Sequence, residues 1–227
     1  MVELKERTKA SLALAKARIT RASGSAETLI ADAPGQPAGE ILRITAKVQN
    51  PILVLGTHSR SGLERFFIGS TAEEVLRHAQ YPVVTVGPHV TPFWHRKIRR
   101  LMLATDLTER SLASLPFLVS LWSSGMRLLV LHVASPDSEI TPSSWTDSIR
   151  DRLVVALGEN EVRKQVEFRL LVDVKLPYAI AETASKAKAD LLAIGVHPAK
   201  ALTAYTSPRT GFQIVMSAPC PVLSVCE

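Results

Sequence analysis

The sequence predicts an α/β protein made of two tandem copies of one module, each a doubly wound parallel sheet. Short apolar runs alternate with segments of helical periodicity along the chain, as they do in βαβ units. The chain also repeats itself: residues 56–58 match residues 195–197 in their glycine and histidine, at an offset of 195 − 56 = 139. Pro82 matches Pro221 at the same offset, so no insertion separates the copies in this region.

In the first copy, apolar residues at helical spacing predict two helices, residues 2–21 and 38–47. Apolar runs predict strands at residues 27–31, 52–55 and 83–86. A third helix is expected to begin at Ser70, with Ser70 as its cap and the carboxylate of Glu73 three positions later.

The second copy shows the same alternation at greater length. Strands are predicted at residues 98–104, 127–133, 166–172, 191–194 and 222–225. Helices are predicted at residues 111–123, 144–157, 177–187 and 210–218.

The offset reveals a deficit in the first copy. Met1 aligns with Ile140, so residues 98–139 have no counterpart, and the first copy lacks a first strand, a first helix and a second strand. We therefore expect an incomplete domain at 1–90, a linker at 91–97 and a full domain at 98–227. The sheet could close across the gap, another chain could supply the strands, or the natural start could lie upstream of Met1; we favour the last because an open apolar edge invites aggregation.

Composition limits the function classes. The chain has 227 residues, 46% hydrophobic and 21% charged, as in a globular protein. No run approaches the roughly 18 apolar residues of a membrane span, and no signal peptide is recognisable, so a cytoplasmic protein without a membrane partner is expected. Cys220 and Cys226 fit neither a zinc site nor a disulfide framework and are interpreted as buried thiols.

The net charge is +6, and the basic residues are scattered except at residues 95–100. This cluster is either a solvated linker or a polyanion-binding patch. Nucleic acid is not favoured as a partner, because the only aromatic residues beside the cluster are Phe93 and Trp94.

A loop with three glycines, Gly56, Gly62 and Gly69, joins the strand at 52–55 to the helix at Ser70. Free amides at a helix start, together with loop amides, suit a phosphate or another small anion. The alternative is that these glycines serve backbone geometry only.

Residues 56–86, GTHSRSGLERFFIGSTAEEVLRHAQYPVVTV, resemble the signature segment of the universal stress protein family. The family pattern is G-x2-G-x9-G-[ST], and Gly56, Ser59, Gly69 and Ser70 reproduce its spacing with serine in place of the second glycine. The resemblance covers nearly the whole chain. It implies two tandem Rossmann-like domains of the adenine nucleotide alpha hydrolase type, with strand order 3-2-1-4-5.

The resemblance also implies a nucleotide site, with ATP as the candidate cofactor and no metal beyond any Mg²⁺ bound with it. Its implied residues are Gly56, Ser59, Gly69, Ser70, Thr71, Asp106 and Val133. Asp106 and Val133 match the positions that hold adenosine in ATP-binding members, although Asp106 is equally read as a turn or capping aspartate. The second copy has Pro198 for the second glycine and Pro208-Arg209 for the final pair, so no ordinary ATP site is expected there.

By this resemblance, the chain is expected to be a cytoplasmic stress-response or regulatory protein. Family domains pair through their last strands, so residues 83–86 and 222–225 are expected to form an internal pseudo-dimer, with a homodimer as a further option. The alternative is a nucleotide-free scaffold of the same fold. No enzyme is expected, because no nucleophile elbow or paired carboxylates occur, and His58 and His197 each lack a partner ligand.

Overall fold

The computed structural model describes residues 2–22, 24–31, 35–57, 69–91, 97–137, 142–173, 175–196 and 208–226. Its contacts define two compact units, Met1–Glu40 and Ile41–Glu227. The first unit contains helix α1 (Val2–Arg21) and the beginning of α2 (Pro37–Thr45).

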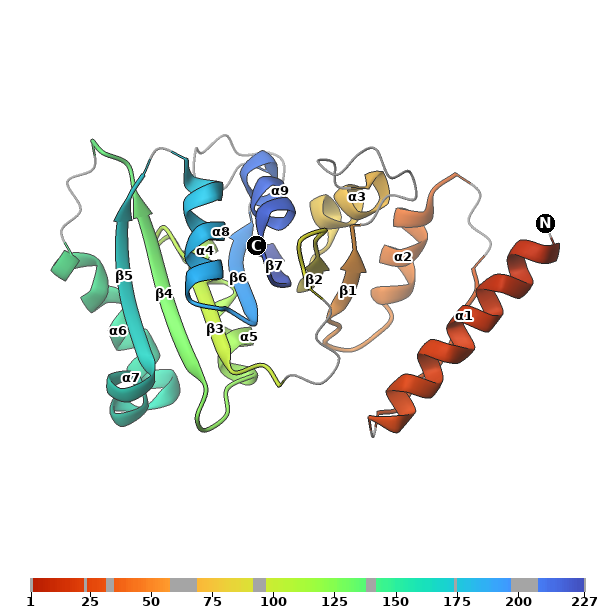
Figure 1. Cartoon of the computed structure of the whole chain (residues 1–227), viewed down its shortest axis with the longest axis horizontal. Helices are drawn as coiled ribbons and strands as arrows, with labels where there is room; N and C mark the ends of the chain where they lie inside the picture. The colour runs from red at the N-terminus through yellow and green to blue at the C-terminus, as the bar shows by residue number, and fades with distance from the viewer. Residues whose placement is uncertain are drawn as a thin grey trace. The chain divides into compact units, whose positions relative to one another are not determined.

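The second unit is built on one sheet of seven strands in the order β1-β2-β7-β6-β3-β4-β5 (Figure 1). The strands are β1 Leu53–Gly56, β2 Val83–Val86, β3 Arg100–Ala104, β4 Arg127–Ala134, β5 Val166–Val172, β6 Leu191–Val196 and β7 Val222–Cys226. Neighbours are parallel except β2 and β7, which pair antiparallel. The α/β class is confirmed, and the five strands of the second copy follow the expected order 3-2-1-4-5.

Helices cover both faces of the second-copy strands. They are α4 Glu109–Leu112, α5 Leu115–Ser120, α6 Pro142–Leu157, α7 Glu159–Gln165, α8 Leu176–Lys186 and α9 Pro208–Ser217. The first copy contributes α3 Ser70–His78, between β1 and β2. Leu101, Leu103 and Ala193 point to a core shared with residues of α4 to α7. The alternate strand residues face the other way, where α8 and α9 contact each other in front of the sheet (Figure 1).

Two expected elements differ from the structure. The strand predicted at residues 27–31 is wrong, because residues 24–31 form neither strand nor helix. No strand of the described sheet pairs with this segment, so its backbone joins no ladder there. The helix predicted at 111–123 is divided into α4 and α5, because Pro116 starts a new helix after Ser114.

Helix α7 was not predicted. Gly158, at φ 88°, ends α6 and begins α7, whose only buried residue is Val162. A single apolar residue gives no helical periodicity to detect. The other predicted helices and strands are present, with ends shifted by a few residues.

The repeat relates α1 to α6, since 153 − 14 = 139 aligns Leu14 with Leu153. Leu153 is completely buried in the core on α6, whereas Leu14 on α1 is 56% exposed.

Candidate functional site

The first-copy loop begins where β1 ends. Thr57 follows Gly56 and is buried, and its backbone N–H donates to the carbonyl of Val86 on β2 at 3.1 Å. This bond fixes the end of β1 against its neighbour. Ser59 and His58 lie outside the described residues, and the description resumes at Gly69.

The N-cap residue of helix α3 lies one position earlier in the chain than the sequence predicted. Gly69 is the N-cap, and the N–H of Glu73 donates to the Gly69 carbonyl at 2.9 Å. The capping role predicted for Ser70 is therefore wrong, and the Glu73 carboxylate instead pairs with Arg77 at 2.6 Å. Glycine needs no side-chain bond to serve as an N-cap, so the pattern of a hydroxyl followed by a carboxylate misled the prediction.

The amides that open α3 have no acceptor among the described residues. Within the described part of the chain, the N–H groups of Ser70, Thr71 and Ala72 donate to no acceptor, and the Gly69 cap supplies no side-chain bond. The side chain of Ser70 is exposed. This helix start can accept an anion through three backbone donors and the helix dipole.

Asp106 stands just after β3 and holds a tight turn. Its Oδ1 accepts bonds from the N–H of Thr108 at 3.1 Å and from the Thr108 hydroxyl at 2.6 Å. Thr108 in turn caps α4 by accepting from the N–H of Ser111 at 3.2 Å. Asp106 is thus a turn aspartate, and its second oxygen makes no hydrogen bond to any described residue, which leaves it available to a hydroxyl donor.

Val133 is buried near the end of β4. Because β3 and β4 are parallel neighbours, with Ala104 opposite Leu131, Asp106 and Val133 lie at the same edge of the sheet. The role of these two residues in holding adenosine, which the family resemblance implies, stays a prediction.

The structure does not bring these two groups of residues together. Strands β2, β7 and β6 separate β1 from β3. The antiparallel pairing of β2 with β7 also reverses direction, so the carboxyl end of β1 faces the opposite edge of the sheet from the carboxyl ends of β3 and β4. Gly56 and Gly69 therefore belong to one half-site, and Asp106 and Val133 to another.

The two motif glycines have different surroundings. A Cβ on Gly195 would lie 2.0 Å from the carbonyl oxygen of Arg110 and 2.5 Å from Cα of Ser111, both on α4. A Cβ on Gly56 would meet no described atom within 4 Å. In the second copy, the absence of a side chain at Gly195 lets helix α4 pack closely against β6. The spacing of the motif glycines did not predict this role, because no described first-copy helix corresponds to α4.

Sequence reasoning also missed the hydroxyls that build the Asp106 turn. Buried Thr105 and Ser111 share a hydrogen bond of 2.7 Å, and Thr105 Oγ1 accepts from the N–H of Leu107 at 2.9 Å. The signal was the run of hydroxyl residues around Asp106, which is typical of turns and caps.

Shifted pKa values mark two places. Arg152 on α6 donates a hydrogen bond from Nη1 to Glu109 Oε2 on α4 at 2.8 Å. The hydrogen bonding between these two side chains lowers the pKa of Glu109 and raises the pKa of Arg152. Burial, and then the charge of Asp190, raises the pKa of Cys220 to about 12. Cys220 is buried as predicted, while the side chain of Cys226 lies outside the described residues.

The described residues bear on two further kinds of site, a shared metal site and a membrane-spanning helix. They contain no group of three or more His, Cys, Asp or Glu side chains placed to share a metal ion. No helix among them has the length and apolar character to cross a bilayer.

A model of the universal stress protein family matches residues 2–87 and 97–225. The chain belongs to the universal stress protein family. Both copies of the repeat fall within the match, so the chain carries two tandem universal stress segments.

Comparison with an individual universal stress protein agrees with this family assignment. The universal stress protein MJ0531 of Methanocaldococcus jannaschii is 42% identical over 52 residues, which are 23% of this chain and 31% of that protein. The chain thus spans about a third of that relative's length.

Solved structures of similar proteins cover almost the whole chain. A universal stress protein from Archaeoglobus fulgidus has a TM-score of 0.71 at 19% identity, covering 99% of this chain and 78% of that one. The functionally unknown protein PA1789 from Pseudomonas aeruginosa has a TM-score of 0.58 at 16% identity, covering 96% and 77%. At these identities the likeness shows the fold.

Proposed function

We propose that this universal stress protein is a cytoplasmic, non-enzymatic regulator of the stress response that binds ATP through its first-copy loop. Five residues would form the phosphate side of the site: Gly56, Ser59, Gly69, Ser70 and Thr71. The observation that carries the proposal is the set of free amides at the start of α3, because three N–H donors without described acceptors at a helix start suit a phosphate.

The affinity is expected to be weak. Asp106 and Val133 stand at the opposite sheet edge and cannot complete the first-copy site. No described strand of the first copy is a counterpart of β3 or β4 that could hold the adenosine. Phosphate contacts alone would then carry binding, so we expect saturation only near millimolar ATP unless the missing strands are supplied.

The two copies are further proposed to act as an internal pseudo-dimer. The last strands pair antiparallel, with Val84 opposite Leu223. Above them, the guanidinium of Arg77 on α3 lies 5.0 Å from the ring centroid of Phe212 on α9. A Cβ on Gly87 would meet the Val215 carbonyl at 2.4 Å, so the chain after β2 runs against α9. Such tight contact would let a ligand at α3 influence α9.

Substitution of Gly69 tests the ATP site. A Cβ there meets no described atom within 4 Å, and the φ of −60° suits any residue, so both Gly69→Asp and Gly69→Asn should fold. Both side chains are good N-caps, but only aspartate brings a negative charge against the phosphates. In a titration of the full chain with labelled ATP, Gly69→Asp should abolish saturation, while Gly69→Asn should weaken it by only a few-fold.

The same titration has a result that removes the proposal. If the unsubstituted protein shows no saturable binding up to a few millimolar ATP, or if the Asp and Asn variants bind alike, the α3 amides do not hold phosphate.

A nucleotide-free scaffold is the second candidate. The packing of Gly195 against α4 favours it, because it shows that a glycine of this motif is needed in the second copy without any ligand. A scaffold predicts that Gly69→Asp leaves the stress phenotype unchanged.

A further inference from the structure

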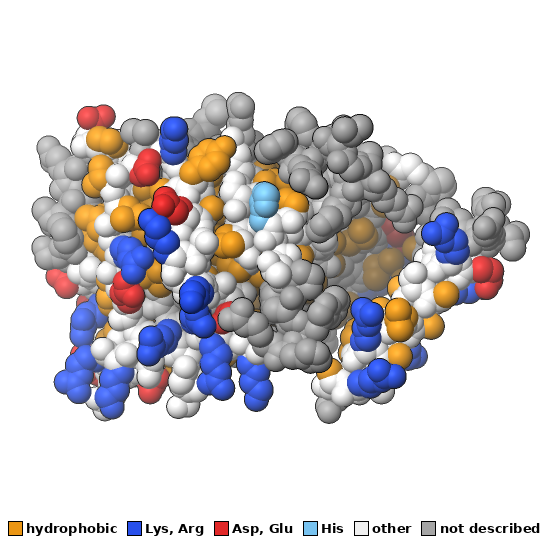
Figure 2. Space-filling view, in the orientation of Figure 1, with side chains coloured by type: hydrophobic (Ala, Val, Ile, Leu, Met, Phe, Trp, Pro, Cys, Tyr) orange, Lys and Arg blue, Asp and Glu red, His pale blue; other side chains and the backbone are white. Residues whose placement is uncertain are grey.

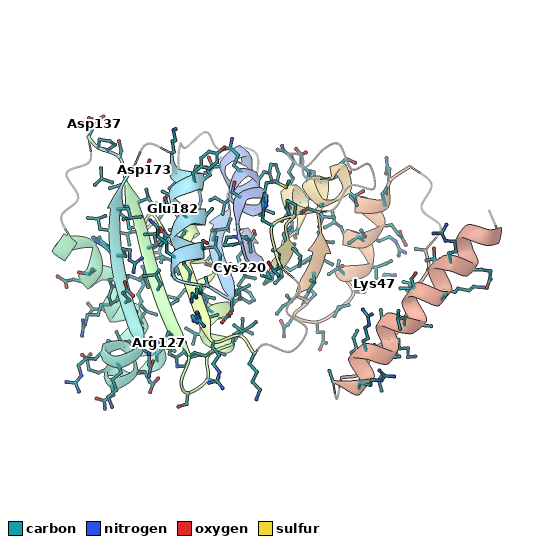
Figure 3. The ribbon with its side chains drawn as sticks, viewed as in Figure 1. Lys47, Arg127, Asp137, Asp173, Glu182 and Cys220 are labelled. Carbon is teal, nitrogen blue, oxygen red and sulfur yellow. The ribbon has the colours of Figure 1, made fainter. Side chains whose placement is uncertain are left out.

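A basic hollow lies at the end of the second-copy sheet away from Asp106 and Val133. Its volume is about 800 Å³, and it is lined by Lys97, Arg99, Arg100, Gly125, Arg127, Lys186, Ala187, Lys188 and Asp190. We name it the cationic hollow. Figure 2 shows Lys and Arg side chains gathered along the lower margin of this unit, and Figure 3 places Arg127 at the lower end of β4.

Backbone hydrogen bonds fix the framework of the cationic hollow. Asp190 Oδ2 accepts from the N–H groups of Arg99 and Arg100, both at 2.9 Å. The N–H of Asp190 donates to the Arg100 carbonyl, and the N–H of Arg127 donates to the Arg99 carbonyl, each at 2.8 Å. Three segments of the chain that are distant in sequence are therefore held side by side, and their basic side chains project from fixed positions.

The charge of the hollow is unbalanced. Six lining residues are cationic and one, Asp190, is anionic, and an oxygen of that carboxylate is engaged by backbone amides. Lys186 pairs with Glu182 at 2.7 Å. Among the described residues, no carboxylate pairs with the other five cations: Lys97, Arg99, Arg100, Arg127 and Lys188. Like charges held this close repel one another, so a bound polyanion would stabilise the arrangement.

The lining indicates which polyanion fits. Among the described residues, its lining contains no aromatic side chain on which a base could stack, and such stacking is a main component of single-stranded nucleic-acid recognition. Three arginines offer the planar fork that binds phosphate oxygens in pairs. We propose that the cationic hollow binds linear inorganic polyphosphate, whose charges are closely spaced and carry no base.

This site is separate from the ATP loop. The hollow lies at the amino ends of β3 and β4 and the end of α8, whereas the proposed phosphate amides belong to α3. The loss of one binding activity should therefore leave the other intact.

Titration calorimetry of the full chain with short-chain inorganic polyphosphate tests the proposal. The test variant is Arg127→Gln with Lys188→Gln. The control is Lys47→Gln with Lys175→Gln, which removes the same charge from exposed positions before β1 and at the opposite end of α8. We expect saturable binding at low salt, at least tenfold weaker in the test variant and within about twofold in the control. The dependence of log K on log salt should also become shallower in the test variant.

Three results would overturn the proposal. The first is no saturable binding at low salt, and the second is an equal loss in the test and control variants, which would mean that net charge alone attracts the ligand. The third is tighter binding of an oligothymidylate of matched charge, which would make the hollow a nucleic-acid site. Circular dichroism of both variants establishes that they remain folded before they are compared.

Discussion

Cys220 shows how burial governs a single residue. Its thiol is buried just before β7, and burial with the nearby charge of Asp190 raises its pKa to about 12 from an ordinary 9.0. At neutral pH the thiol is therefore protonated and unreactive.

This shift predicts an alkaline loss of stability. Because the folded thiol has the higher pKa, its contribution is complete below the unfolded pKa near 9.0 and is lost as pH rises toward about 12. The free energy of unfolding of the native protein should fall more steeply with pH in that window than that of Cys220→Ala, by up to about 1.4 kcal/mol per pH unit. Urea unfolding at a series of pH values measures the two slopes, and equal slopes would show that Cys220 ionises freely in the fold.

Gly56 and Gly195, the equivalent motif glycines of the two copies, allow a matched comparison of single residues. Gly195→Ala forces a methyl group into the Arg110 carbonyl and should cost about 2 kcal/mol or more, because backbone on both sides must move. Gly56→Ala meets open space and should change stability by less than about 0.5 kcal/mol. Urea midpoints compare them, and a similar cost for both would mean that α4 does not set the glycine requirement.

At the scale of elements, β1 and β6 are the same strand of the repeat in two environments. Ile52 and Val54 are 51% and 63% exposed, whereas their counterparts Leu191 and Ala193 are 3% and 0% exposed. Strand β6 lies between β3 and β7, with α4 against it, while β1 pairs only with β2 among the described strands. The same apolar pattern is therefore core in one copy and an open sheet edge in the other.

This difference predicts opposite responses to one substitution. Ala193→Asp would place a carboxylate in the core without a partner and should lower the free energy of unfolding by at least about 3 kcal/mol. Val54→Asp on the exposed edge should cost less than about 1 kcal/mol and reduce aggregation. Thermal unfolding with light scattering measures both effects, and a severe loss of stability in Val54→Asp would mean that another part of the molecule covers β1.

At the scale of the whole molecule, the repeat made most of the fold predictable. The apolar runs, each bounded by a turn, predicted the second-copy strands, and the resemblance to the universal stress protein family implied their order. The strand expected at residues 27–31 failed because local pattern cannot supply a missing neighbour. The sequence predicted only part of the cationic hollow, namely the basic cluster at residues 97–100. Arg127 and Lys188 join that cluster through contacts that spacing along the chain does not encode.

The sequence predicted which residues belong to the candidate site, but not that these residues lie in two separate half-sites. The spacing from Gly56 to Ser70 identified the loop, and the position of Asp106 after its strand was correct. The reversal of direction between β2 and β7, which separates the two half-sites, depends on how the copies meet. The motif residues of each copy, taken alone, do not predict this reversal of strand direction.

Native mass spectrometry of the full chain, alone and with millimolar ATP, tests the central claim that the first copy grips a nucleotide through the α3 amides. With millimolar ATP, the native protein should carry one added adenine nucleotide mass, which Gly69→Asp should lose and Gly69→Asn should keep. An absence of any adenine nucleotide adduct on the native protein, or an adduct that persists in Gly69→Asp, would contradict it.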